Sequence, residues 1–344
     1  MQGAASSEYT FAEPLIEEAV RKQLNIADTE PVTEADLEKV VSLHIFGLQI
    51  YSSEDEIYFQ GAYPYVYNSE MQESGLYEQT GTISSLEDIT HMPNLRTLCL
   101  YRQQITDISV LADESLGITE LGLGYNSLTD LSPLTGNNTI VYLNLAALSI
   151  SDDTVTEVIS TMSSLQTLNI SSTGIRSLNG LENCPITDLN IFDVELDNYT
   201  ELALLEGLTD LEISYLTGSI VQALTGLPLK SLIVHNPNGY SLEVLSALAD
   251  LEYLCVYDPY MSTFTFGQVD LPSLKTLEIK NTVITDFYDL AALDSLSTLM
   301  IYSCECESYD GLDALSGLST ICCTEEQANA IRAEYPDADY FYSY

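Results

Sequence analysis

The feature that most constrains this chain is a spacing of leucines and isoleucines that recurs through most of its length. One clear copy has leucines at 95, 98 and 100, followed by Ile105 and Ile108. Copies begin, about 22 residues apart, at Leu95, Ile118, Ile140, Leu165, Ile186, Leu208, Leu229, Leu251, Leu274, Leu296 and Leu318. Each copy has room for one short strand, a turn and a return segment, so its apolar face must be buried against its neighbours.

This pattern is that of the leucine-rich repeat. It predicts an α/β solenoid, a horseshoe with a parallel β-sheet on its concave face. In the copy at Leu95, the three leucines point into the core, and alternation along the strand sends residues 97, 99 and 101 to the concave face. Because each repeat packs only on its neighbours, we expect one elongated body from the 344 residues rather than separate globular domains.

The sequence predicts a cap at each end of the repeat array. The second amino-terminal helix is expected to begin after Thr33, and Thr324 with Gln327 forms a capping box for a carboxy-terminal helix that precedes a last strand at 339–342. The predicted divisions are a disordered tether (1–7), a helical N-terminal cap (8–39), a first repeat with an insertion (40–94), the leucine-rich repeats (95–317), and the last repeat strand with a helix-strand C-terminal cap (318–344).

The insertion at 51–82 interrupts the first repeat and is acidic and rich in tyrosine. Insertions in solenoids form loops on one face, and long loops in compact domains are usually functional or disordered. Tyrosine supplies rigid contact area in binding loops, which makes Tyr58 and Tyr65 candidate ligand contacts. The alternative is a hairpin that folds on the adjacent repeats and extends the cap.

Charge limits the partners that this surface can have. Ten Lys and Arg against 52 Asp and Glu give a formal net charge of −42, which repels phosphate backbones and anionic membranes. Nucleic acid is therefore excluded, and basic protein segments and neutral glycans remain. No apolar run approaches the roughly 18–20 residues of a membrane span, and we expect any signal or anchor to lie outside this sequence.

The sequence favours neither catalysis nor a cofactor. It has three histidines and no hydrolase, metalloprotease or phosphate-binding motif. Cys99 and Cys255 fall in one column roughly 34 Å apart and cannot form a disulfide. We expect buried thiols at Cys304, Cys306 and Cys323, with one disulfide among them as the alternative, and their spacing predicts no metal site.

The concave columns divide into two zones. The face is small and polar around Ala146, Asn169 and Ser171, and it becomes aromatic and apolar from Phe192 onward. Aromatic residues amid sparse charge are typical of interface cores, and exposed apolar side chains mark binding sites. The candidate ligand-binding residues of this face are Phe192, Tyr215, Ile233, His235, Tyr253, Tyr257, Met300 and Tyr302.

A resemblance to a known family begins at the cap. Residues 13–24 and 32–37, followed by repeats that carry Ile-Thr-Asp-Ile or Ile-Thr-Asp-Leu, resemble the internalin-type leucine-rich repeats of bacterial surface proteins. The resemblance implies a bacterial cell-surface or secreted location and a non-enzymatic binding role. Repeats between 208 and 273 depart from the pattern, no anchoring motif is present, and no ligand contact carries over from the family.

Two functions follow from these observations. The first is a monomeric, extracellular, non-enzymatic recognition module with a tyrosine-rich concave binding face. Its ligand would be a protein, including a basic protein, or a neutral glycan. The alternative is a structural spacer or self-assembly module of the bacterial cell surface. An enzyme ranks third, with no metal and no cofactor expected.

Overall fold

The structure is a computed structural model, and it describes residues 8–53, 79–113, 115–235, 242–258, 263–264, 267, 269–332 and 335–342. These residues form two compact units. Unit 1 comprises residues 1–175 and 179–185, and unit 2 comprises 176–178 and 186–344.

Unit 1 begins with the predicted helical cap. Helix α1 (Pro14–Leu24) starts on a proline, buries a stripe of apolar side chains and ends at Asn25 in the left-handed conformation, with φ of 55°. Helix α2 (Glu34–Leu37) follows Thr33, whose backbone N–H and hydroxyl donate to the Asp36 carboxylate at 3.0 and 2.7 Å. The N-cap expected at Thr33 is confirmed, because both partners of a capping box are in place.

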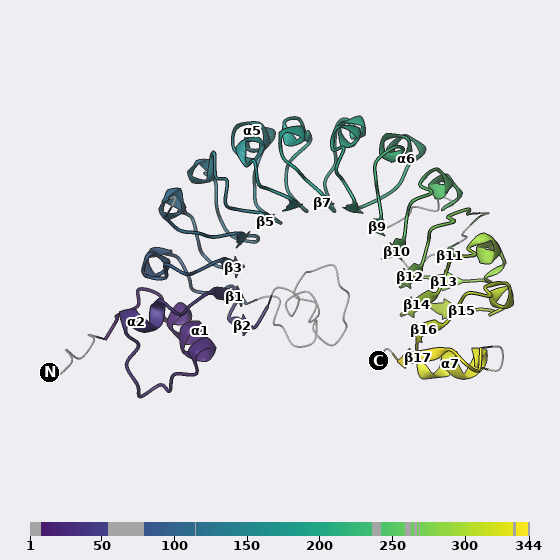
Figure 1. The fold of residues 1–344 in the computed structure, drawn as a ribbon, viewed down its shortest axis with the longest axis horizontal. Coiled ribbons are helices and arrows are strands. Elements are labelled where there is room, and N and C mark those ends of the chain that lie inside the picture. Colours follow the sequence, from purple (N-terminus) through teal and green to yellow (C-terminus); the bar gives the residue numbers. More distant parts are fainter. Residues whose placement is uncertain are drawn as a thin grey trace. The chain divides into compact units, whose positions relative to one another are not determined.

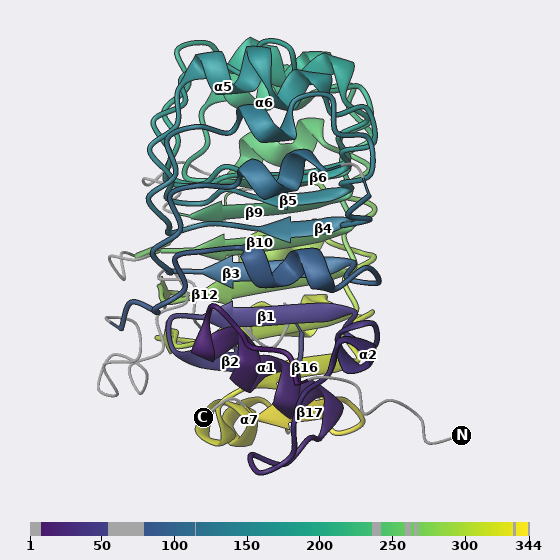
Figure 2. The same cartoon turned by 90° about the vertical axis from the view of Figure 1, so that its left-hand side faces the viewer.

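The repeats of unit 1 each contribute one strand to a sheet (Figures 1 and 2). The strands are β1 (Ser42–Phe46), β2 (Gln49–Tyr51), β3 (Thr97–Tyr101), β4 (Glu120–Gly122), β5 (Tyr142–Asn144) and β6 (Thr167–Asn169). β1, β3, β4, β5 and β6 are parallel, and their repeat leucines pair strand to strand, as Leu98 does with Leu121. β2 turns back and pairs antiparallel with β1.

Short helices return the chain of unit 1 on the other side of the core. They are η2 (Glu87–His91), η3 (Ser109–Ala112), η4 (Ser132–Leu134), α5 (Asp152–Glu157), η5 (Ile159–Thr161) and η6 (Leu181–Asn183). All except α5 are 3-10 helices, because a 22-residue repeat leaves room for only one tight turn. α5 lies in the repeat that begins at Ile140, the longest of the copies from Leu95 onward.

Unit 2 continues the same construction. Its main sheet contains β7 (Asp188–Ile191), β8 (Asp210–Ile213), β9 (Ser231–His235), β10 (Tyr253–Tyr257), β12 (Thr276–Lys280), β14 (Thr298–Tyr302), β16 (Thr320–Cys323) and β17 (Asp339–Tyr342), in this order. All neighbouring pairs are parallel. A second small sheet, which the sequence did not predict, contains β11 (Thr263–Phe264), β13 (Val283–Ile284) and β15 (Glu305–Cys306).

The return segments of unit 2 include one helix that the sequence did not predict. They are η7 (Tyr199–Leu204), α6 (Gly218–Leu224), η8 (Leu242–Ala247), η9 (Tyr288–Ala292), η10 (Leu312–Ala314) and α7 (Glu325–Ile331). α6 lies in the degenerate repeats, where Thr217 caps it by accepting the Ile220 N–H. α7 begins at the predicted capping box of Thr324 and Gln327, and β17 follows it as the expected last strand.

A left-handed residue follows most of the strands. Positive φ angles occur at Gly47, Arg102, Tyr125, Ala147, Ser172, Asp193, Asn281 and Ser303, between 53° and 61°. A residue other than glycine loses about 1–2 kcal/mol in this conformation. The turn therefore recurs because the geometry of the repeat requires it, although the side chain at this position varies.

Two buried carboxylates join the cap of unit 1 to the first repeats. Asp88 is 0 % exposed and accepts hydrogen bonds from the Tyr9 hydroxyl and the Ala12 and Glu13 backbone N–H groups, at 2.9, 2.9 and 3.0 Å. The Glu13 carboxylate accepts in turn from the backbone and hydroxyl of Ser84 at 2.8 and 3.0 Å. The cap is thus held to the solenoid by ionisable side chains as well as by its apolar stripe.

Candidate functional site

The candidate binding surface is the face of the main sheet in unit 2 that points away from the return helices, here called the open face (Figure 1). Along β7 and β8, the leucines and isoleucines are buried, and the alternate residues are half-buried. This alternation is the one that the repeat predicts for a strand with one face in the core.

The residues predicted from the sequence differ in how exposed their side chains are. On the sheet itself or at its strand ends, Phe192, Ile233, Tyr253, Met300 and Tyr302 are half-buried, while His235 and Tyr257 are each only 8 % exposed. Substitution of Tyr257 would therefore disturb packing as well as any contact with a ligand.

Of the other three predicted residues, one is held at a strand end and two lie outside the described residues. The Tyr215 hydroxyl accepts a hydrogen bond from the Tyr199 hydroxyl at 2.8 Å, so this ring is held at the strand end by η7. Tyr58 and Tyr65 lie outside the described residues, as does the part of the predicted insertion from 54 to 78. The role of Tyr58 and Tyr65 as ligand contacts therefore stays a prediction.

An aromatic row crosses the open face between β7 and β10. The Phe192 and His235 ring centroids are 4.3 Å apart, and those of His235 and Tyr257 are 5.5 Å apart with the rings near-perpendicular. Close ring contacts of this kind fix the orientation of each ring. The row is therefore a pre-ordered aromatic cluster in which Phe192 is half-buried and His235 and Tyr257 are nearly buried.

A polar chain holds the histidine of this row in place. Glu212 accepts from the Asn190 side-chain amide at 2.6 Å, and its other oxygen lies 2.6 Å from His235 Nε2. The Asn190 side-chain oxygen, Oδ1, accepts the Phe192 N–H at 2.9 Å. In unit 1, Asn144 holds the chain two residues on in the same way. Glu212 is therefore the residue that anchors His235 on this face.

A second polar cluster lies between β10 and β14. The Tyr253 hydroxyl donates to the Glu278 carboxylate, which is also paired with Lys280 Nζ at 2.8 Å. Lys280 Nζ is 5.9 Å from the centroid of the Tyr302 ring, which places a cation at this aromatic face. Cys255 is buried beside this cluster, and burial, more than the nearby Glu278 charge, raises its pKa to about 12. Its thiol is therefore protonated at neutral pH and is not a nucleophile.

The remaining chemistry is sparse. All seven cysteines are free thiols, and burial raises the pKa of Cys304 to about 12 and that of Cys306 to about 11. Within the described ranges, no group of three or more His, Cys, Asp or Glu side chains is placed to hold a metal ion. Among those same residues, no helix has the length and apolar character needed to cross a membrane.

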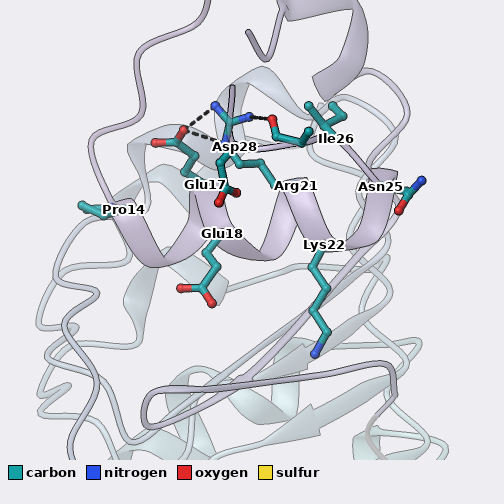
Figure 3. Close-up of a pocket in the computed structure, with 9 residues that line it drawn as sticks. Pro14, Glu17, Glu18, Arg21, Lys22, Asn25, Ile26 and Asp28 are labelled. Atoms are coloured by element: carbon teal, nitrogen blue, oxygen red, sulfur yellow. Dashed lines mark hydrogen bonds and ion pairs between the residues drawn. The ribbon is translucent and has the colours of Figure 1, made fainter. Parts of the chain in front are cut away.

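A hollow of about 830 Å³ lies beside α1 in unit 1 (Figure 3). Its cations are already engaged, because Arg21 bonds to Glu17 and to the Ala27 and Glu30 carbonyls, and Lys22 Nζ donates to the Ile50 carbonyl at 2.7 Å. These contacts secure the segment that follows α1. None of the predicted ligand-binding residues that the structure describes lines this hollow.

Carboxylates gather at the β7 end of the open face. Asp188 and Asp210 are register partners on adjacent strands, and Glu212 follows on β8. Burial, followed by the charges of Asp210 and Glu212, raises the pKa of Asp188 to about 6. Like charges opposite one another destabilise a sheet, so this arrangement works against folding at neutral pH.

Replacement of Asp188 by asparagine is expected to stabilise unit 2 by about 1–2 kcal/mol at pH 7.5, after allowance for solvent screening. The pKa of Asp188 is about 6 in the folded chain, against 3.8 for the unfolded chain, so the protonated carboxyl favours folding below pH 3.8. This contribution to stability is lost as the pH rises through about 6. The gain should therefore vanish near pH 4, as measured by urea unfolding at both pH values.

Asp130→Asn is the matched control for this prediction. Hydrogen bonds from Ser132 lower the pKa of Asp130, so removal of this charge should not stabilise the chain at pH 7.5. Equal gains from the two substitutions would show that only the overall charge matters, and that Asp188 has no special environment.

The sequence matches no family model and no curated protein. Similar solved structures include an internalin (inlF) from Listeria monocytogenes, with 19% identity, a TM-score of 0.48 and coverage of 90% of this chain and 95% of that one. A leucine-rich-repeat protein from Leptospira interrogans has 13% identity and a TM-score of 0.41 over 98% and 100% of the two chains. A TLR13–ssRNA13 complex has 16% identity and a TM-score of 0.42 over 72% and 48%.

The class of the protein follows from its own architecture. Strand, left-handed turn and short return helix recur at the repeat spacing in both units, with in-register parallel strands. The chain is a leucine-rich repeat solenoid with a helical N-terminal cap and a helix-strand C-terminal cap. The predicted fold class is confirmed.

Proposed function

We propose that the chain is a non-enzymatic recognition module that binds a protein on the open face of unit 2. The observation that supports this function best is half-buried Phe192, which packs in a row with His235 and Tyr257 on the sheet face opposite the described return helices. Half-buried Ile233 and Tyr302 extend the apolar area. A bacterial cell-surface location belongs to the same proposal and rests on the sequence resemblance.

The physical case rests on pre-organisation. Burial of apolar surface contributes about 25 cal/mol per Å², and rings that are already fixed lose little entropy when a partner arrives. Fixed contacts on this face include the Glu212–His235 pair and the Glu278–Lys280 pair. The open face therefore presents aromatic area with a defined shape, as interface cores do.

Tyr302→Ala is expected to weaken binding at least about tenfold, in line with loss of one aromatic anchor. The measurement is biolayer interferometry of the purified chain against a panel of immobilised extracellular proteins and polysaccharides, at low and high salt. Tyr302 is half-buried, so its loss should change the melting temperature only slightly.

Tyr288→Ala is the matched control, because Tyr288 is 63 % exposed on η9, outside the sheet. It should leave binding unchanged. Equal losses from the two tyrosines, or binding that neither affects, would contradict the placement of the site. A hit restricted to polysaccharides and insensitive to salt would instead identify a neutral glycan that stacks on the tyrosines.

A further inference from the structure

Phe341 lies at the β17 end of the open face. Among the described residues of the main sheet, it is the most exposed large apolar side chain, at 60 %. Strands β14, β16 and β17 are neighbours, and their registers pair Met300 with Cys322 and Cys322 with Phe341 (Figure 1). In-register residues of parallel strands point to the same face, so these three side chains form one row, here called the Phe341 column. Phe341 was not among the residues predicted from the sequence, which assigned 339–342 only to the cap.

Apolar surface continues from the Phe341 column to Tyr302. Tyr302 follows Met300 by two residues on β14, so both side chains lie on the open face, and both are half-buried. The Cys322 thiol lies beside the Tyr302 hydroxyl. The two rings and the thioether therefore form one partly exposed apolar area, and areas of this kind mark interaction sites.

The charges around the Phe341 column are few and paired, although the chain carries −42. Strands β14 and β16 contain no Asp, Glu, Lys or Arg. On the next strand, β12, Glu278 and Lys280 pair with each other at 2.8 Å. Asp339 begins β17, but it is in register with Thr320, outside the column. A partner side chain over the Phe341 column therefore meets apolar groups rather than charges.

We propose that the Phe341 column binds an uncharged apolar segment of another protein, with one aliphatic or aromatic side chain packed over Cys322 between Met300 and Phe341. The inference rests on the proposed function, because it assigns the chemistry of the partner and a further contact residue to the same face.

The side chains of the column suit an apolar anchor. Cys322 is small, and it separates two larger side chains that lie one strand away on either side, about 4.8 Å in each direction. Methionine adapts its shape to an apolar partner, and phenylalanine supplies a large rigid ring. Both residue types are enriched at the cores of protein interfaces.

Charge argues against two other occupants of this surface. A second copy of the chain would bring its own charge of −42, so the two copies would repel each other. A basic segment would find Glu278 already paired with Lys280, so it would gain no new ion pair there. An uncharged segment removes apolar surface from water without either disadvantage.

The test uses the full chain and two immobilised biotinylated peptides, followed by biolayer interferometry at low and high salt. One peptide is biotin-Gly-Ser-Leu-Phe-Leu-Ser-Gly-amide, and the other has serine at the three apolar positions. The site variants are Phe341→Ala and the conservative Phe341→Leu. Because Phe341 is 60 % exposed, both should keep the native melting temperature. The control variant, Leu204→Ala, removes an apolar side chain that is 51 % exposed on η7.

We expect the apolar peptide to bind the native chain and Leu204→Ala equally within about twofold, and Phe341→Ala about tenfold more weakly. Phe341→Leu should stay within about threefold of the native chain, because it keeps an apolar contact. The dissociation constant should change less than about twofold between low and high salt, since no charge pair forms.

Four outcomes would contradict the inference. Equal weakening by Phe341→Ala and Leu204→Ala would show adsorption to any exposed apolar side chain. A steep loss of binding at high salt would show that the partner needs charge, and equal binding of the two peptides would show that it needs no apolar side chain. Failure of the apolar peptide to bind, while Tyr302→Ala still weakens a partner from the panel, would overturn the apolar segment and leave the proposed function intact.

Discussion

Replacement of Asp88 by alanine is expected to destabilise unit 1 by about 3–5 kcal/mol. The substitution leaves the Tyr9 hydroxyl and the Ala12 and Glu13 N–H groups without their acceptor in a site that is 0 % exposed at Asp88. Each buried donor that loses its partner costs about 1–3 kcal/mol, and part of that cost is recovered where water can enter. The effect should therefore be large and local to the cap.

The measurement is urea unfolding combined with amide hydrogen exchange. Exchange should accelerate first in residues 9–37, because these residues include the cap helices that Asp88 holds. The control is Asp107→Ala, an exposed carboxylate that accepts one N–H from Ser109 at 2.8 Å, with an expected loss of about 1 kcal/mol or less. Similar losses at Asp88 and Asp107 would show that the buried acceptor does not hold the cap.

Substitution of Gly311 by alanine is expected to destabilise unit 2 by about 3 kcal/mol or more. Gly311 has φ of +92°, and an added Cβ would lie 2.7 Å from both the Phe287 carbonyl carbon and Tyr288 Cα. Real Cβ atoms essentially never approach so closely, so the backbone of η9 or η10 must move. Phe287 is itself 0 % exposed, which leaves little room for that movement.

Gly226→Ala separates the two components of this effect. Gly226 has φ of +98°, but an added Cβ would meet nothing within 4 Å. The free energy of unfolding should fall only by the cost of an alanine in the left-handed backbone conformation, about 1–2 kcal/mol. Thermal unfolding of both variants gives the comparison. Equal shifts in melting temperature would show that the close approach to Phe287 and Tyr288 does not contribute to the destabilisation by Gly311→Ala.

These two stability predictions concern opposite kinds of constraint. The cap requires the Asp88 carboxylate as a hydrogen-bond acceptor. The repeat turn, in contrast, has no room for a side chain at Gly311. Neither lies on the open face, so neither variant tests the binding proposal. The variants that address binding, Tyr302→Ala and Phe341→Ala, remove a half-buried and an exposed side chain of the open face.

The local features of the fold could be predicted from the sequence. Repeat spacing located the repeat strands, and the residue types at Thr33 and Thr324 located two helix starts. Such signals are readable because they depend on residues within one repeat, where backbone geometry and side-chain alternation act over a few positions.

The candidate site was only partly predictable. The alternation of β9 and β10 placed Ile233 and Tyr253 on the open face, and the structure finds both half-buried there. It did not predict that Tyr257 would be nearly buried against His235, or that Tyr215 would bond to Tyr199 on η7. Burial depends on the size of the neighbouring side chains across strands, which one strand alone does not reveal.

The sequence by itself determined the repeat, its strand register and the nature of its caps, because those follow from spacing along the chain. Only the tertiary structure decided that Asp88 accepts from Tyr9, 79 positions away. It likewise decided that Glu212 holds His235 and leaves Asp188 without a donor among the described residues. Hydrogen bonds and charge pairs require atoms within a few ångströms, and such proximity between distant residues is set by packing rather than by local spacing.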